Sequence, residues 1–180
     1  MDNKPTLKDI MTFGAERGAI LGIYFCVLIA LLIFEIYVPV LSLVVLAMII
    51  WVPFLVYRWL KKSDKTTGGI FTISMLWLQG IALFFFASVI LAVGVFVFLR
   101  FIQPDFMSDM VNFIMESAKA ADNPALTQQA SMLEQIISES GIPRAIDMAL
   151  NLGWSAIFTG SILSLLLAVL VKSRRIPRTS

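Results

Sequence analysis

Two long apolar stretches restrict what this chain can fold into. Between Gly18 and Tyr57 the sequence runs for forty residues with Glu35 as its only charged residue, twice the roughly 20 residues that one membrane-spanning helix requires. A second stretch, Ile70–Phe101, has Gln79 as a strongly polar interruption. Hydrophobic residues make up 59% of the chain and charged residues 14%, against about 45–50% and about 25% in soluble domains. This composition excludes a disordered chain, a nucleic-acid-binding protein and an ordinary soluble enzyme, and predicts an integral membrane protein.

These stretches, together with a third near the C-terminus, predict an all-α fold built as a four-helix transmembrane bundle. Glu35 and Pro39 divide the first stretch into two spans, because proline disfavours helix in the preceding residue and can begin the next helix. Residues 58–69, rich in lysine and ending in two glycines, are expected to form a basic, flexible connector. The expected divisions are an N-terminal segment 1–17, three spans within 18–99 (18–34, 40–57 and 74–99), an outer segment 100–150, a fourth span 152–171 and a tail 172–180.

The outer segment is acidic, and its apolar residues recur with the period of an amphipathic helix. We expect a helical hairpin here, with helices over residues 105–120 and 124–140 and a stop at Gly141. One side of the first helix carries Asp105, Asp109, Asn112 and Glu116. The other side carries Phe106, Met110, Phe113 and Ile114. That apolar side fits three occupants: the second hairpin helix, the outer leaflet of the membrane, or a partner protein.

Basic residues are concentrated on one side of the predicted bundle. Four spans place both termini on the same side, and eleven of the fourteen lysines and arginines fall on that side. Short loops rich in lysine and arginine stay in the cytoplasm, so both termini are expected there. The absence of an Asn-X-Ser/Thr sequon favours a bacterial inner membrane. The residues expected to contact anionic lipid headgroups are Arg58, Lys61, Lys62, Lys172, Arg174 and Arg175.

Two of the predicted helices carry a small residue at every fourth position. The first stripe consists of Gly14, Gly18, Gly22, Cys26 and Ala30. The second consists of Ala156, Gly160, Ser164 and Ala168. Small residues at this spacing let helix backbones approach closely inside a membrane. The stripes therefore either pack against other helices of the same bundle, or dock a second protein or another copy of the chain.

Few residues within the spans could take part in catalysis or bind a ligand. The chain has no histidine, and Cys26, its one cysteine, excludes a disulfide within the chain. No nucleophile–base pair, phosphate-binding loop or metal-ligand spacing is found, so we expect no catalytic residue, no cofactor and no metal site. Glu35, at the outer boundary, is either an interfacial turn residue or a carboxylate coupled to transport. Gln79 is expected to hydrogen-bond a neighbouring helix, or alternatively to contact a substrate.

The order of these features resembles an uncharacterised family of small four-span membrane proteins from Gram-negative bacteria, a domain of unknown function. The resemblance rests on the entry GAERGAILG, a closely following second span, the basic turn before FTISMLWLQGIALFFFASVILAVG, and a helical insert before the fourth span. It implies no catalytic residues. It implies an association with membrane glycosyltransferases, because genes of the two lie near one another.

Together these features favour a non-catalytic inner-membrane partner or scaffold protein. Its expected partners are the lipid bilayer and either a second membrane protein or another copy of the chain; an accessory subunit of a glycosyltransferase acting on polyprenyl-phosphate fits the resemblance. The alternative is a small transporter or lipid-translocating protein, whose polar path Gln79, Ser88 and Ser164 would line. A third interpretation is an enzyme in the outer hairpin, with Asp105, Asp109 and Glu116 as its carboxylates.

Overall fold

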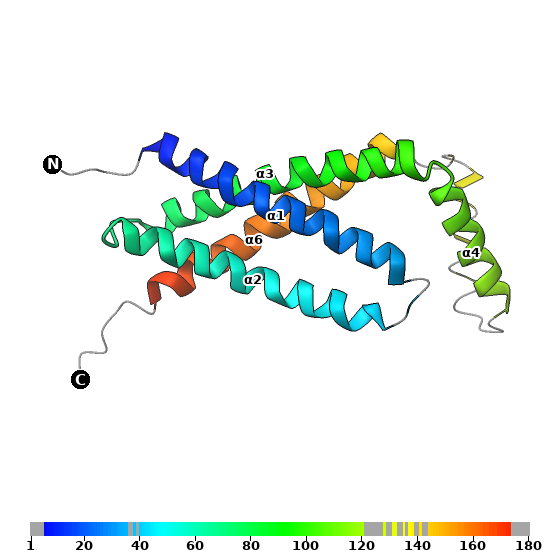
Figure 1. Cartoon of the computed structure of the whole chain (residues 1–180), viewed down its shortest axis with the longest axis horizontal. Coiled ribbons are helices and arrows are strands. Elements are labelled where there is room, and N and C mark those ends of the chain that lie inside the picture. The colour runs from blue at the N-terminus through cyan, green and yellow to red at the C-terminus, as the bar shows by residue number, and fades with distance from the viewer. Residues whose placement is uncertain are drawn as a thin grey trace. The chain divides into compact units, whose positions relative to one another are not determined.

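The computed structural model describes residues 6–35, 38, 40–120, 128, 131–132, 135, 137–138, 141 and 144–173. Over these residues the chain is helical and has no strand, which confirms the predicted all-α fold (Figure 1). The elements are α1 (Leu7–Glu35), α2 (Leu41–Thr66), α3 (Ile73–Val97), a π-helical turn η1 (Phe98–Ile102), α4 (Phe106–Ala120) and α6 (Ala145–Ser173). Four helical stretches are long and apolar enough to cross a membrane: α1, α2, α6, and α3 extended through η1.

The chain forms two compact units, and α3 and α6 each contribute to both. The first unit consists of Met1–Ala92 and Leu152–Ser180, and the second of Val93–Asn151. The predicted second hairpin helix, 124–140, lies largely outside the described residues. The first unit therefore contains α1, α2 and most of α3 and α6, and the second contains η1 and α4.

The first helix begins well before its apolar stretch because a capping motif starts it. The Thr6 backbone N–H and hydroxyl both donate to the Asp9 carboxylate, at 2.8 and 2.7 Å, and the Asp9 N–H donates back to the Thr6 Oγ1 at 3.4 Å. This reciprocal arrangement satisfies backbone donors left unpaired at a helix start. These bonds hold the pKa of the Asp9 carboxyl below its ordinary value. The helix α1 consequently starts at Leu7 and carries polar turns ahead of its membrane segment.

The prediction of a flexible basic connector over residues 58–69 is wrong for most of these residues. Helix α2 continues through Thr66, and Gly68 and Gly69 then turn the chain with φ of 70° and 85°. Lysine and arginine are good helix formers, so the loss of hydropathy after Tyr57 does not end the helix. Glycine adopts a positive φ at little cost, and the two glycines end it.

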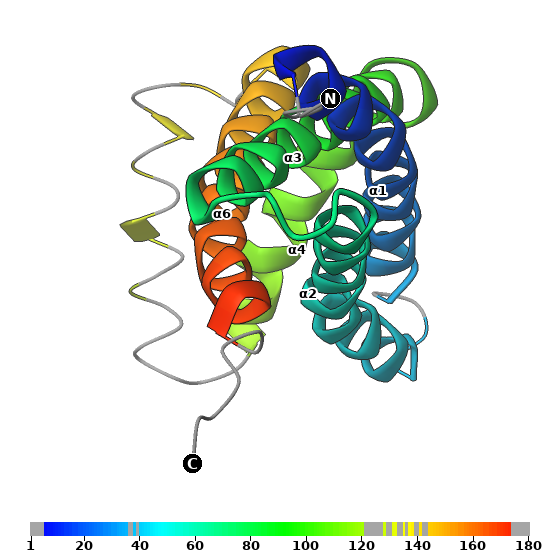
Figure 2. The same ribbon diagram turned by 90° about the vertical axis from the view of Figure 1, so that its left-hand side faces the viewer.

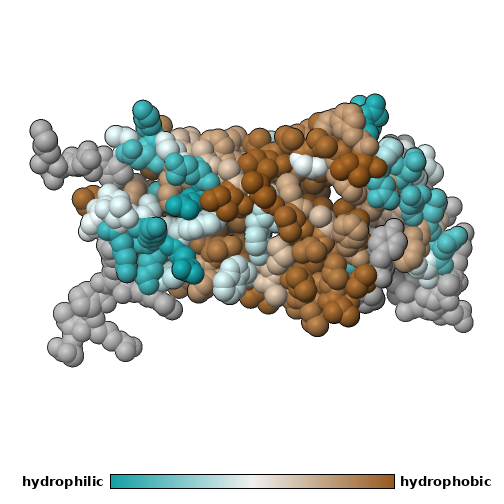
Figure 3. All heavy atoms as spheres, viewed as in Figure 1, coloured by the Kyte–Doolittle hydropathy of each residue, from teal (hydrophilic) through white to brown (hydrophobic). Residues whose placement is uncertain are grey.

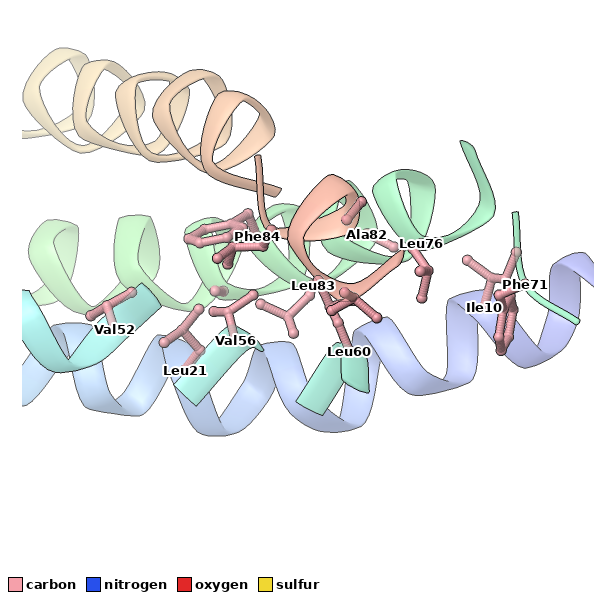
Figure 4. Close-up of a cluster of buried hydrophobic side chains, with 14 residues drawn as sticks. Ile10, Leu21, Val52, Val56, Leu60, Phe71, Leu76, Ala82, Leu83 and Phe84 are labelled. Atoms are coloured by element: carbon pink, nitrogen blue, oxygen red, sulfur yellow. The ribbon is translucent and has the colours of Figure 1, made fainter. Parts of the chain in front are cut away.

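Helix α3 is the centre of the first unit. In its most apolar stretch 39% of the residues are buried, against 17% to 28% of the residues in the corresponding stretches of the other three membrane-spanning candidates. Viewed along the bundle, it lies between α1 and α6 (Figure 2). The buried cluster joins Leu21 of α1, Val56 and Leu60 of α2, and Leu76 and Leu83 of α3 (Figure 4). Many apolar side chains remain exposed on this unit, and Figure 3 shows an apolar surface that becomes hydrophilic toward the left of the view, as expected of helices that face lipid.

Glycines bring α1 into close contact with α3, and we call this contact the α1–α3 seam (Gly14, Gly18 and Gly22 on α1). A methyl group added to Gly18 would lie 2.5 Å from the Leu83 carbonyl oxygen. One added to Gly22 would lie 2.9 Å from the Ala87 carbonyl oxygen. Contacts this short leave no room for a side chain, so these glycines set the distance between the two backbones.

A second seam joins α3 to α6. Gly160 of α6 faces the ring of Phe84, and Gly80 of α3 faces the side chain of Ser164, in each case so closely that an added methyl group would collide. Ala168 is also buried, whereas Ala156 is half-buried and Ala30 is exposed. Both small-residue stripes therefore lie largely against α3 within the same chain.

We expect Gly18→Ala to destabilise the protein, because the added methyl group meets a backbone carbonyl that cannot rotate away. Such overpacking costs about 1–3 kcal/mol, although alanine otherwise gains about 1 kcal/mol over glycine inside a helix. The matched control is Gly153→Ala, whose methyl group would lie 3.6 Å from the Ala92 Cβ, an ordinary contact. Thermal unfolding in detergent should show a lower midpoint for Gly18→Ala and an unchanged or higher one for Gly153→Ala. Equal midpoints would contradict the seam.

Candidate functional site

A buried ion pair lies at the end of the first unit where α2 stops, α3 begins and α6 stops. Asp64 of α2 is only 1% exposed. The Lys172 Nζ of α6 lies 3.1 Å from Asp64 Oδ1 and also donates to the Gly69 carbonyl oxygen at 3.0 Å. The side chain of Lys172 is 22% exposed, so the ammonium group reaches inward from the rim of the bundle. We call this contact the Asp64–Lys172 pair.

The turn after α2 builds this site. The Gly69 N–H donates to the Asp64 carbonyl oxygen at 2.8 Å and the Gly68 N–H to the Lys65 carbonyl oxygen at 3.0 Å. These bonds satisfy carbonyl groups that a helix end leaves unpaired. With the turn closed in this way, the Gly69 carbonyl faces Lys172 beside the carboxylate.

The pair joins residues that are 108 positions apart. A buried carboxylate is costly unless a cation and hydrogen bonds compensate it, and here one ammonium group contacts both a carboxylate and a carbonyl. The contact holds the C-terminal end of α6 against the end of α2. The Asp64–Lys172 pair therefore joins the ends of α2 and α6 at the basic end of the unit.

A second buried contact lies near the start of α3. The Gln79 Nε2 donates to the Ser63 Oγ at 2.9 Å, and Gln79 is almost fully buried. Within the described part of the chain, the Gln79 Oε1 and the Ser164 Oγ are buried without a hydrogen-bond partner. Ser88 is buried too, but its hydroxyl donates to the Phe85 carbonyl of its own helix at 2.7 Å. The Gln79 amide therefore links α3 to α2, while the Ser88 hydroxyl stays within α3.

Three cationic side chains at this end lie over aromatic rings. The distance from the Arg17 Cζ to the Trp59 ring centroid is 5.9 Å, and from the Arg58 Cζ to the Phe54 ring centroid 5.9 Å. The Lys61 Nζ lies 5.5 Å from the Tyr57 ring centroid. Each contact of this type contributes about 0.5–1 kcal/mol at an exposed site. We call this set the basic–aromatic rim (Arg17, Phe54, Tyr57, Arg58, Trp59 and Lys61).

The remaining predicted residues lie in different places. Lys62 is exposed on α2 near the rim, and Arg174 and Arg175 lie outside the described residues. Glu35 is half-buried and is the last residue of α1, at the opposite end of that helix from Arg17. The Cys26 Sγ lies 3.8 Å from the Ile90 carbonyl oxygen, inside the α1–α3 seam. Their roles in lipid contact, transport or partner binding remain predictions.

The Asp64–Lys172 pair was missed at the sequence level, because nothing local connects the two residues. One signal was present: Asp64 is the only acidic residue between Glu35 and Asp105, and it stands among lysines. A single acid in a basic segment next to a membrane span is a candidate for an ion pair. Among the described residues, no group of three or more histidine, cysteine, aspartate or glutamate side chains could hold a metal ion.

We expect Lys172→Met to destabilise the protein by about 3–5 kcal/mol, because it removes the Lys172 ammonium group from a buried carboxylate. The double variant Asp64→Leu/Lys172→Met should recover most of this loss, since it removes both charges. Lys62→Met, an exposed lysine at the same end of the unit, is the control and should change stability little. Chemical unfolding in detergent provides the measurement. A double variant less stable than Lys172→Met, or a control that loses as much, would refute this role for the pair.

Comparison with known proteins assigns the chain to a family of unknown function. A family model described as a protein of unknown function (DUF4199) matches residues 12–173, which include the four apolar helices apart from the first residues of α1. No curated protein and no solved structure matches the chain. The resemblance to an uncharacterised four-span family is confirmed. This chain therefore belongs to the DUF4199 family.

Proposed function

We propose that this protein is a non-catalytic integral protein of the bacterial inner membrane that acts as a partner or scaffold for a second membrane protein. The basic–aromatic rim is the observation that carries the proposal. Arg17, Arg58 and Lys61 each lie over a ring, beside helix ends that the Asp64–Lys172 pair joins. Cations arranged in this way suit binding to the acidic surface of a partner at the level of anionic headgroups.

The charge distribution supports a cytoplasmic position for this end. In the described part of the first unit the basic residues are Lys8, Arg17, Arg58, Lys61, Lys62, Lys65 and Lys172. They belong to the first half of α1, the end of α2 and the end of α6, which meet at the hydrophilic end on the left of Figure 3. Cytoplasmic loops are enriched in lysine and arginine, so we assign both termini to the cytoplasm.

The partner class we propose is a membrane glycosyltransferase acting on polyprenyl-phosphate. This class is the one that the resemblance to the four-span family implies. The chemistry of the rim agrees, because the phosphate groups of such a substrate lie at headgroup level and arginine and lysine bind phosphate well. A second copy of the chain is the other partner to be distinguished.

A small transporter or lipid-translocating protein is the second candidate. The buried Gln79 Oε1 and Ser164 Oγ favour it, because polar atoms without partners among the described residues can line a path for a polar substrate. The Ser88 hydroxyl argues against a continuous path, since it is bonded to its own helix. We therefore rank this function below the scaffold.

The orientation can be tested with single cysteines in a Cys26→Ser background. We expect a membrane-impermeant maleimide added to spheroplasts to label Asn112→Cys in α4 and to leave Lys62→Cys in α2 unlabelled. Lysis should then expose Lys62→Cys. Labelling of Lys62→Cys in intact spheroplasts would reverse the assignment, because Lys62 lies at the basic end.

The scaffold role predicts a co-purifying partner. In mild detergent we expect a second membrane protein to be recovered in stoichiometric amount with the wild-type chain. Its recovery should fall about tenfold in Arg58→Gln/Lys61→Gln/Lys62→Gln, because three surface charge contacts of about 0.5 kcal/mol each correspond to one decade of affinity. Lys119→Gln in α4 is the control and should leave recovery unchanged.

The identity of the recovered protein separates the versions of the proposal. A glycosyltransferase identified by mass spectrometry supports the proposed partner class, and a homo-oligomer supports self-association instead. A chain that purifies alone as a monomer, with wild type and triple variant behaving alike, would refute the scaffold role.

A further inference from the structure

Helix α4 has more apolar surface than its contacts cover. Successive residues of a helix are about 100° apart, so Met110, Phe113 and Ile114 lie on one side, and Val111 and Met115 on an adjoining one. Val111 and Met115 are half-buried. Met110, Phe113 and Ile114 are exposed, Phe113 to 59% of its surface. One apolar face of α4 is therefore packed and a second is open.

The open face continues the apolar surface of the membrane-spanning stretch. The candidate span that begins at Ile73 extends to Ile102, and its last residues Phe101 and Ile102 are exposed to 73% and 69%. Four residues later α4 begins, and the ring of Phe106 meets that of Phe98 edge-on at 5.7 Å between centroids. Phe106 stands in the same row of α4 as Met110 and Phe113. The exposed apolar side chains thus run from the end of the span onto α4.

Backbone hydrogen bonds define the change of direction between the two elements. The Gln103 N–H donates to the Phe98 carbonyl oxygen across the π-helical turn, and the Phe106 N–H donates to the Gln103 carbonyl oxygen. Within the second unit, α4 leaves the end of α3 in a new direction rather than extending it (Figure 1). A helix that turns aside at the end of a span, with an open apolar face, is placed to lie along the membrane surface.

The side of α4 that adjoins the open face at Phe113 is suited to water. Asp105, Asp109, Asn112 and Glu116 are all exposed. At about 100° per residue they fall together within an arc of about 60° that borders the open face at Phe113. Three carboxylates on this side would be repelled by anionic headgroups. The chemistry of the helix therefore fits a neutral, zwitterionic lipid surface with hydrocarbon on one side and water on the other.

We propose that α4 is an interfacial helix, which lies on the bilayer beside the end of the third span. Met110, Phe113 and Ile114 insert among the lipid chains, and the side with Asp109, Asn112 and Glu116 faces the aqueous phase. The occupant of the open face is lipid. The acidic side is then the surface of this segment that a soluble molecule meets.

Nitroxide accessibility in phosphatidylcholine vesicles tests the placement. Single cysteines are introduced into the full-length Cys26→Ser protein, spin-labelled and compared for collision with oxygen, which concentrates in lipid, and with a water-soluble nickel chelate. We expect Phe113→Cys and Met110→Cys to show an oxygen-to-nickel ratio several-fold above that of Asn112→Cys. Ile50→Cys, at an exposed apolar position of α2, provides the lipid reference and Glu116→Cys a second water reference.

Two results would overturn the proposal. If Phe113→Cys and Met110→Cys collide with the nickel chelate as often as Asn112→Cys, the open face lies in water. If both are protected from oxygen as well as from nickel, the face is covered by protein. Because Met110 and Phe113 are separate positions on the face, a single variant that folds poorly leaves the other to decide.

Discussion

Association of helices inside a bilayer gains nothing from apolar burial as such, because lipid chains are as apolar as leucine. What remains is the closeness of packing, and in this protein it depends on the backbone of α3. Gly18 and Gly22 of α1 approach the carbonyl oxygens of Leu83 and Ala87, and Gly160 of α6 faces Phe84 from another side. Helix α3 can be approached this closely because small residues meet it from both neighbours. These contacts place α1 and α6 against α3.

A different interaction joins the helices where the apolar environment ends. Near the water boundary a charged group can be partly compensated by its surroundings, and a buried pair is tolerated when extra hydrogen bonds complete it. Lys172 reaches Asp64 and the Gly69 carbonyl, so the turn that ends α2 also binds the end of α6. The basic–aromatic rim is built beside this contact, on α2 and on the first half of α1. Bundle stability and the proposed binding surface therefore depend on the same end of the same helices.

In the second unit, helix α4 has both an apolar and a charged side. Helix α4 is neither apolar enough to cross a membrane nor polar all round, and its charged side chains gather on one side. A helix of this composition is stable where apolar and aqueous surroundings meet. Phe101 at the end of the third span and Phe113 on α4 both expose most of their surface, which makes the bilayer the simplest occupant.

Hydropathy and residue spacing were enough to predict an all-α chain with four apolar helices and the acidic amphipathic character of α4, whereas the family followed from a resemblance in the order of these features. These properties are local: they depend on the length of an apolar stretch and on which residues share a helix face. The small-residue stripes were also visible in the sequence, but their common neighbour, α3, was not. The extent of α2 was mispredicted because lysines lower hydropathy without ending a helix. Only the tertiary structure decided the Asp64–Lys172 pair and the two seams, because each depends on residues far apart in sequence that meet only when the helices are packed.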